Sequence, residues 1–156
     1  MTRILYIDMD GVLVDFTSAY GRLTTWEKNT YNPDDDDPED ANYDEVPNIY
    51  SRMEPMDGAV AAYEKLSQVY ETYILSTAPW ENSTAWSDKL EWVKKHLGDV
   101  AHKRLILSHN KHLNKGDYLI DDRKKNGADK FDGELIHFAS DRYPDWNSIL
   151  RYLLQV

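Results

Sequence analysis

The sequence contains no cysteine and no long apolar run. Without cysteine, the chain can form neither a disulfide framework nor a thiolate metal site. No stretch approaches the roughly 20 consecutive apolar residues that a helix needs to cross a bilayer. The first residues, Met1, Thr2 and Arg3, are unlike a signal peptide. These absences argue against disulfide-stabilised and membrane-spanning proteins, and a cytoplasmic location is the default expectation.

Positive charges are outnumbered by negative ones. Lysine and arginine number 18 against 28 aspartates and glutamates, so the net charge is −10. Such a chain is poorly suited to a nucleic-acid polymer, which requires clustered basic residues, or to an anionic membrane surface. Neither G-x-x-x-x-G-K nor G-x-G-x-x-G occurs, which argues against P-loop and dinucleotide-binding proteins. A small phosphorylated substrate remains open, because a metal ion and a few local cations can reverse the field in one pocket.

Five short apolar segments predict β-strands, and helical patterns lie between or after them. The segments are nearly continuous in apolar residues, which is typical of a parallel sheet covered on both faces. We therefore expect an α/β fold with a doubly wound, mostly parallel five-stranded sheet. The expected strands are residues 4–7, 72–75, 104–107, 118–120 and 135–138.

Three amphipathic helices are expected around this sheet. The first should follow an N-cap at Asp57, the second should run from about residue 83 to Gly98, and the third should start near Asp145. Each carries apolar residues at helical spacing. The three stripes are Val60, Tyr63, Leu66 and Val69; Trp86, Leu90, Val93 and Leu97; and Trp146, Ile149, Leu150, Leu153 and Leu154.

Residues 15–55 interrupt the alternation of strands and helices and are too many for a simple connection. We interpret them as a small, mainly helical cap inserted after the first strand, with a candidate helix at 16–28 and an acidic loop at 31–42. The core would then comprise residues 1–14 and 56–156. The loop is expected to be solvated, since its consecutive aspartates do not reproduce the spaced ligands of a calcium loop.

Asp8 and Asp10 follow the first predicted strand, and Gly11 then allows a sharp turn. Because side chains alternate along a strand, both carboxylates can point into one site. Their mutual repulsion is tolerable if Mg²⁺ lies between them or if one stays protonated. Either arrangement indicates phosphate chemistry, with one aspartate as nucleophile and the other as proton shuttle.

Polar residues also follow three other predicted strands, at the edge where open α/β sheets bind ligands. Thr77 follows the second strand, Lys111 lies shortly after the third, and Asp121 and Asp122 follow the fourth. Carboxylates can bind Mg²⁺, while a hydroxyl and an ammonium can hold phosphoryl oxygens. The set therefore supplies each need of phosphoryl transfer.

These motifs resemble those of the haloacid dehalogenase (HAD) superfamily of phosphatases, and within it the 5′(3′)-deoxyribonucleotidase family. The resemblance covers most of the chain outside the acidic loop. It implies a HAD-like Rossmannoid core and hydrolysis of deoxyribonucleoside monophosphates to nucleoside and phosphate. The matching stretches are 8–16 (DMDGVLVDF), 76–79 (STAP), 88–93 (DKLEWV) with 97–98, and Lys111 with 116–123 (GDYLIDDR).

The resemblance also implies roles for the strand-end residues. Asp8 would attack phosphorus and form an aspartyl-phosphate, and Asp10 would protonate the leaving oxygen and later deprotonate water. Thr77 and Lys111 would complete the catalytic set by stabilising the phosphoryl group.

The Mg²⁺ cofactor would be held by Asp8, the backbone carbonyl of Asp10, and Asp121. Asp122 would assist through the metal's waters or by orienting Lys111.

The substrate would contact Phe16, Thr77, Ala78 and Lys111. Lys115 lies nearer the fourth strand, but the family pattern favours Lys111. Mammalian relatives tend to have Thr-Ser-Pro followed by a lysine that also contacts phosphate, whereas here Ala78 replaces the serine and no lysine follows. Whether Lys89 or Arg123 compensates is left open by the sequence.

Aromatic residues of the expected cap offer a slot for a nucleobase. Phe16 is the leading candidate, and the slot would be completed by Tyr20, Trp26 and either Tyr43 or Tyr50. The alternative is that these rings pack the cap on the core.

Two other functions compete with a nucleotidase. A HAD phosphatase could act on a sugar phosphate or another small phosphomonoester, and a non-catalytic protein could bind a phosphorylated ligand. Family members often form dimers, so a homodimer is a further expectation, although no sequence feature demands one.

Overall fold

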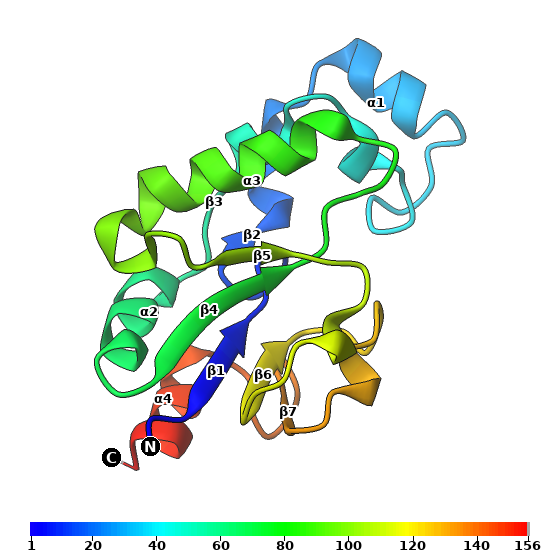
Figure 1. Cartoon of the computed structure of the whole chain (residues 1–156). Helices are drawn as coiled ribbons and strands as arrows, with labels where there is room; N and C mark the ends of the chain where they lie inside the picture. Colours follow the sequence, from blue (N-terminus) through cyan, green and yellow to red (C-terminus); the bar gives the residue numbers. More distant parts are fainter. Residues whose placement is uncertain (156) are drawn as a thin grey trace.

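Five parallel strands form the central sheet of the computed structural model, which describes residues 1–155 (Figure 1). Each strand pairs in parallel with its neighbours. The α/β class and the parallel sheet predicted from the sequence are confirmed. In sheet order, the strands are β5 (Leu105–Leu107), β4 (Glu71–Ser76), β1 (Ile4–Ile7), β6 (Tyr118–Asp121) and β7 (Glu134–His137).

The two faces of the sheet are covered unequally. Leu5 and Ile7 of β1 belong to the larger apolar cluster, to which α2 (Ala59–Ser67), α3 (Ser83–His96) and α4 (Trp146–Leu154) contribute. Tyr6 faces a smaller cluster that includes Ala128 of the short helix η6 (Ala128–Lys130). Because β1 is covered on both faces, its sequence is continuously apolar rather than alternating.

Two of the three predicted helices begin or end as expected. α3 is followed by Gly98 in the left-handed conformation, at φ +68°. α4 follows an N-cap at Asp145, whose side chain accepts a hydrogen bond from the amide of Ser148. The 3-10 helices η4 (Gly98–Ala101) and η5 (Lys111–Leu113) lie on either side of β5 in the sequence.

Three details of the helix predictions are wrong. The N-cap of α2 is Gly58, which is left-handed, and not Asp57. Val69 lies beyond the end of α2 and is exposed, because the chain already turns toward β4. Leu90 is exposed too, because α3 buries a neighbouring stripe of its surface. That buried stripe consists of Ala85, Lys89, Trp92 and Val93.

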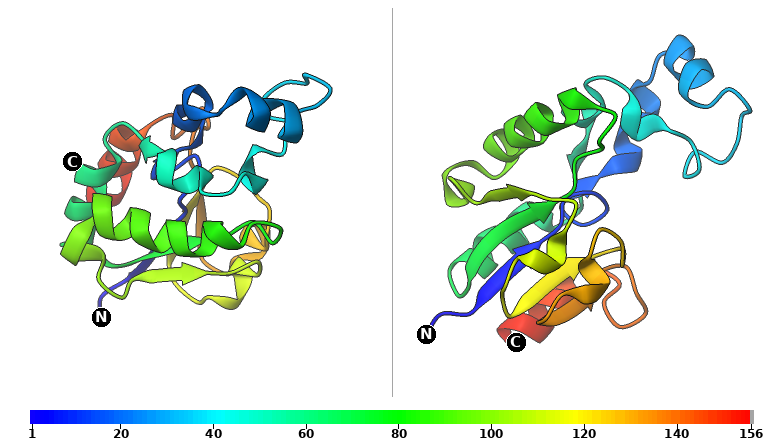
Figure 2. Two further views of the ribbon diagram at one scale, coloured as in Figure 1. Left: turned by 90° about the horizontal axis from the view of Figure 1, so that it is seen from above. Right: turned by 45° about the vertical axis from the view of Figure 1, so that its right-hand side comes forward.

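Residues 16–52 lie between two short strands, β2 (Val14–Asp15) and β3 (Glu54–Pro55), which pair antiparallel. They form η1 (Phe16–Arg22), α1 (Thr25–Tyr31), η2 (Tyr43–Glu45) and η3 (Ile49–Arg52). The structure thus has two helices, η1 and α1, where the sequence predicted a single helix at 16–28. Thr24 and Glu27 form a capping box at which α1 begins as a separate helix. α1 and the loop after it project beyond the carboxyl ends of the strands (Figures 1 and 2).

The segment between β2 and β3 is anchored on the rest of the protein through α3, against which η3 packs. The indole of Trp92 donates a hydrogen bond to the carbonyl of Met53, at 3.1 Å. Within the segment, Arg52 donates two hydrogen bonds of 2.8 Å to the carboxylate of Glu27. This pairing with Arg52 lowers the pKa of Glu27 to about 2.

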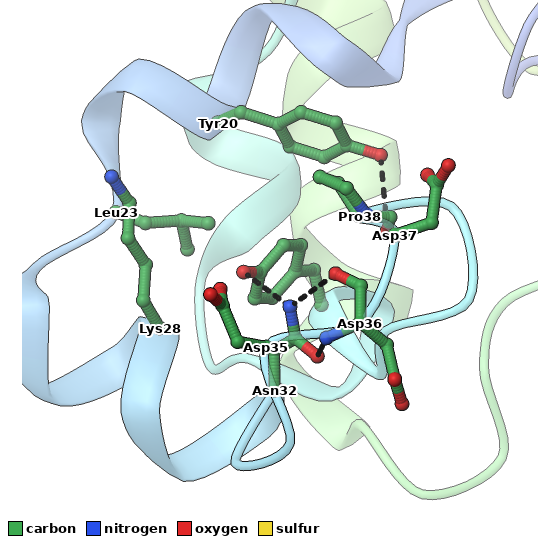
Figure 3. A pocket seen from close by; sticks show the side chains of 9 residues that line it. Tyr20, Leu23, Lys28, Asn32, Asp35, Asp36, Asp37 and Pro38 are labelled. Atoms are coloured by element: carbon green, nitrogen blue, oxygen red, sulfur yellow. Dashed lines mark hydrogen bonds between the residues drawn. The ribbon is translucent and has the colours of Figure 1, made fainter.

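The acidic loop folds back toward Tyr20 and borders an open pocket of about 450 Å³ (Figure 3). The side chain of Asn32 exchanges hydrogen bonds with the backbone of Asp36, and the hydroxyl of Tyr20 donates to the carbonyl of Pro38.

No helix within residues 1–155 is long and apolar enough to cross a membrane.

Candidate active site

Asp8 lies directly after β1, the central strand of the sheet. Its amide donates a hydrogen bond to the carbonyl of Ile120 in β6, at 2.9 Å, and its side chain is buried. The chain then turns sharply: Gly11 has φ +76°, a conformation that favours glycine, and the amides of three following residues donate to the carbonyl of Met9. This hydrogen-bonded turn fixes where Asp8 and Asp10 leave the sheet.

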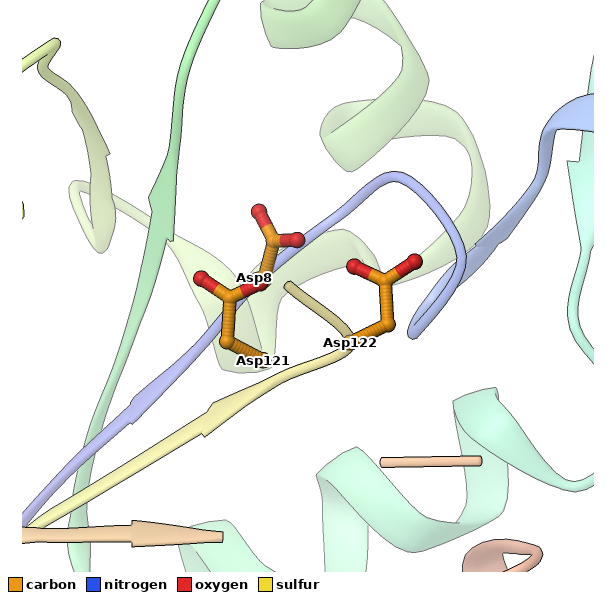
Figure 4. A group of neighbouring side chains, drawn as sticks. All are labelled: Asp8, Asp121 and Asp122. Carbon is orange, nitrogen blue, oxygen red and sulfur yellow. The ribbon is translucent and has the colours of Figure 1, made fainter. Parts of the chain in front are cut away.

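Three carboxylates from two neighbouring strands meet at this edge of the sheet. One oxygen from each of Asp8, Asp121 and Asp122 lies within 4.8 Å of the other two. Figure 4 shows the three side chains gathered at this edge. Gly11 passes so close that a Cβ atom there would lie 2.1 Å from Oδ2 of Asp122. The glycine is therefore required both by its backbone conformation and by the room that Asp122 needs.

Lys111, in η5, supplies the positive charge of this cluster. Its Nζ lies 3.0 Å from Oδ1 of Asp8 and 2.6 Å from Oδ2 of Asp121, and its side chain is buried. Lys115 is exposed and pairs with Asp132 instead. The structure thus brings Lys111, and not Lys115, to the predicted site.

Burial shifts the pKa values of this cluster. Desolvation raises the pKa of Asp8 to about 7, an effect that Lys111 opposes and Asp121 reinforces. Desolvation also raises the pKa of Asp122 to about 6, with a further contribution from Asp8. Burial alone would lower the pKa of Lys111, but Asp8 and Asp121 raise it above its ordinary value. One buried ammonium thus faces several carboxylates, and a site rich in carboxylate oxygens fits a hard divalent cation such as Mg²⁺.

Asp10 has different neighbours from Asp8. Its Oδ2 accepts a hydrogen bond from the hydroxyl of Tyr50, at 3.1 Å, and lies 3.3 Å from Nζ of Lys89. Its Oδ1 is buried and has no hydrogen-bond partner among the described residues. The two aspartates of the first motif therefore occupy separate environments, although one residue separates them in the sequence.

Thr77 and Ala78 form the turn after β4. The hydroxyl of Thr77 donates to the carbonyl of Ser108, at 2.7 Å, and Ala78 is fully buried. Of the two cations that the sequence left open for this turn, Lys89 is directed to Asp10 instead, and Arg123 is exposed.

The contacts of Lys89 and Tyr50 with Asp10 were missed by the sequence analysis. Lys89 lies four residues after Ala85 and three residues before Trp92. This helical spacing could have placed it on the buried face of α3. Tyr50 lies in the short 3-10 helix η3, where no periodicity of the sequence points to the site.

The aromatic residues predicted to form a base slot pack mainly on one another. Phe16 is half-buried and meets Tyr20 and Tyr50 edge to face, with ring centroids 6.0 and 5.9 Å apart. Tyr43 and Tyr50 are buried, and Trp26 is exposed. Tyr43 and Tyr50 are thus part of the larger apolar cluster, and the base slot stays a prediction.

The fold is shared with solved structures of HAD hydrolases. One is the magnesium-bound structure of Bacillus subtilis YfnB, a protein provisionally described as a HAD hydrolase. The TM-score is 0.66 at 12% sequence identity, and the match covers 97% of this chain and 98% of that one. Another is a HAD-superfamily hydrolase (subfamily IA, variant 1) of Geobacter sulfurreducens, with TM-score 0.60, 13% identity and coverage of 98% and 100%. The protein thus has the fold of a HAD hydrolase.

The sequence model of the family described as 5′ nucleotidase, deoxy (pyrimidine), cytosolic type C protein matches residues 2–151, and the chain belongs to this family. The resemblance predicted from the motifs is therefore confirmed, and the protein is an enzyme of the phosphatase class.

Named relatives agree with this membership. A Vibrio phage KVP40 protein, provisionally named 5′(3′)-deoxyribonucleotidase, is 55% identical over 150 residues, covering 96% of this chain and 84% of the relative. The 5′(3′)-deoxyribonucleotidase of Bacillus subtilis is 26% identical over 168 residues, covering 98% and 94%. The human cytosolic-type 5′(3′)-deoxyribonucleotidase is 29% identical over 143 residues, covering 78% and 70%.

Proposed function

We propose that the protein is a Mg²⁺-dependent phosphomonoesterase that hydrolyses deoxyribonucleoside monophosphates through a phosphorylated Asp8. The observation that carries this proposal is the cluster at the carboxyl ends of β1 and β6, where Asp8 and Asp121 contact the ammonium of Lys111 and Asp122 lies beside the two carboxylates. The names of the relatives support the nucleotide as substrate.

The reaction would proceed in two displacements on phosphorus. An oxygen of Asp8 forms a bond to phosphorus while the bond to the nucleoside oxygen breaks, and Asp10 gives that oxygen its proton. Asp10 then takes a proton from water as the water oxygen attacks phosphorus, and the bond to Asp8 breaks. The products are the nucleoside and inorganic phosphate, and both aspartates return to their starting states.

The remaining site residues would hold the transferred group. Lys111 and Thr77 would stabilise the phosphoryl oxygens, and Ala78 and Phe16 would line the substrate site. Asp8, Asp121 and the backbone carbonyl of Asp10 would hold Mg²⁺, with Asp122 acting beside them. When bound, Mg²⁺ would neutralise charge on the phosphoryl group and on the carboxylates around it.

Residues 15–55 would form the cap of this active site, over a core made of residues 1–14 and 56–156. The last position of that range, residue 156, lies outside the described residues. The paired strands β2 and β3, at the two ends of the cap segment, support this division.

The test is phosphate release from a panel of deoxyribonucleotides, ribonucleotides, 3′-nucleotides and sugar phosphates, with Mg²⁺ or EDTA. Wild type is compared with Asp8→Asn. Metal-dependent turnover of deoxyribonucleotides, abolished in the variant, is the expected result. Preference for sugar phosphates would keep the mechanism and reject the nucleotidase, whereas no turnover of any substrate would favour a phosphate-binding protein.

A further inference from the structure

One oxygen of the Asp10 carboxylate is held from two sides, while the other is left without a partner. Tyr50 donates its hydroxyl to Oδ2, and the ammonium of Lys89 lies 3.3 Å from the same atom. Oδ1 is buried and accepts no hydrogen bond from residues 1–155. The surrounding side chains therefore hold the carboxyl group through a single oxygen, Oδ2.

Lys89 is the more unusual of the two neighbours, because its side chain is completely buried. Its Nζ donates to Oγ of Ser76 at 2.8 Å and to the carbonyl of Thr77 at 3.0 Å, and it lies 4.6 Å from the centre of the Tyr50 ring. A buried ammonium is expensive unless it is fully paired, and an apolar side chain would fill the same space without that cost. Lys89 also links the Asp10 turn to the turn that carries Thr77.

Resting on the function proposed above, we propose that Lys89 and Tyr50 are positioning residues for Asp10, fixing Oδ2 and with it the orientation of the carboxyl group that exchanges the proton. Tyr50 comes from η3 in the cap segment and Lys89 from α3. Together they prevent the carboxyl group from rotating about its Cβ–Cγ bond. Through Ser76 and the Thr77 carbonyl, Lys89 also sets the distance between Asp10 and the predicted phosphoryl-binding turn.

The first displacement shows what this positioning would do. The bond from Asp8 to phosphorus forms and the bond to the leaving oxygen breaks. The proton of the Asp10 carboxyl group moves to that oxygen, leaving Asp10 ionised. An alkoxide is a poor leaving group and needs this proton, whereas 4-nitrophenolate leaves without one. Misplacing the carboxyl group should therefore slow release of an alkoxide far more than release of 4-nitrophenolate.

The test uses kcat/KM, which reports steps up to departure of the leaving group and is insensitive to later hydrolysis of the phosphorylated aspartate. It is measured for the best alkyl phosphomonoester of the wild type and for 4-nitrophenyl phosphate. Tyr50→Phe removes only the hydroxyl, and Lys89→Met removes the ammonium but keeps an unbranched chain. Lys94→Met, at an exposed position of the same helix, and Tyr152→Phe, whose hydroxyl contacts Glu134, serve as controls.

In both Asp10-facing variants, the ratio of the two kcat/KM values, alkyl over 4-nitrophenyl, should fall about tenfold or more. Both controls should leave it unchanged. Equal losses on the two substrates in Tyr50→Phe would overturn the inference, because a merely structural role lowers both values alike. Thermal unfolding checks that each variant is folded. If Lys89→Met does not fold, the result for Tyr50→Phe alone decides whether the inference holds. A wild type that hydrolyses neither substrate would instead overturn the proposed function, and this inference with it.

Discussion

Asp8 and Lys111 are 103 residues apart in the sequence, yet Nζ of Lys111 lies 3.0 Å from Oδ1 of Asp8. The parallel sheet explains this proximity. Asp8 follows the central strand β1, and η5 leads into β6, which pairs with β1. A buried lysine placed against the proposed nucleophile can hold the phosphoryl group that this nucleophile receives.

We predict that Lys111→Ala abolishes phosphate release. The substitution removes the only ammonium within hydrogen-bond reach of Asp8 among the described residues, together with its contact to Asp121. Lys115→Ala is the matched control, because that lysine is exposed and pairs with Asp132. It should keep most of the activity, since exposed ion pairs contribute little. Full activity of Lys111→Ala in a phosphate-release assay would contradict the assignment.

Mg²⁺ should stabilise the folded protein by binding among Asp8, Asp121 and Asp122. A ligand that binds only the folded state raises the free energy of unfolding, so the melting temperature should rise with Mg²⁺ concentration relative to EDTA. Asp121→Asn should remove most of this rise, because it deletes one carboxylate of the cluster. Asp132→Asn, which alters an exposed carboxylate, should keep the full shift. An unchanged shift in Asp121→Asn would place the metal elsewhere.

Gly11→Ala should weaken Mg²⁺ binding by about tenfold or more, because the new Cβ would displace Asp122. The left-handed backbone at this position adds a loss of about 1 kcal/mol in the free energy of unfolding. Titration calorimetry with Mg²⁺ measures the first effect and thermal unfolding the second. At Gly21 a Cβ would meet open space, so Gly21→Ala should change neither.

The Glu27–Arg52 pair should stabilise the protein in a pH-dependent manner. The folded-state pKa of Glu27, about 2, lies below its ordinary value of 4.5. Its contribution of about 2 kcal/mol is therefore complete above pH 4.5 and disappears as the pH falls toward 2. Thermal unfolding of Glu27→Gln should show a deficit at pH 7 that shrinks in acid.

The matched control for this prediction is Glu54→Gln, which breaks the exposed pair with Arg22. It should cost less stability than Glu27→Gln, because exposed ion pairs contribute little. A deficit of Glu27→Gln that stays constant from pH 7 to pH 3 would contradict the assignment of the effect to ionisation of this carboxyl group.

The sequence predicted those parts of the site that follow strands. Apolar runs located the strands, and the residues at their carboxyl ends then had to meet at one edge of the sheet. Asp8, Lys111 and Asp121 were found in this way, and the structure places them in contact.

The neighbours of Asp10 could not be found by that reasoning. Lys89 lies on a helix whose apolar stripe was traced through Leu90, and a lysine is rarely expected on a buried face. Tyr50 lies in a short 3-10 helix, where the position of a side chain depends on packing against α3 rather than on sequence periodicity. Both roles depend on tertiary contacts, which a one-dimensional pattern does not record.

The ladder between β2 and β3 places both connections of residues 16–52 on one line, with Val14 opposite Pro55 and Asp15 opposite Glu54. Tyr50 belongs to this segment and Lys89 to α3, so the two groups that hold the Asp10 carboxyl come from the two sides of the contact between η3 and α3. The same packing that anchors the segment on the protein therefore also brings together the two groups that orient Asp10.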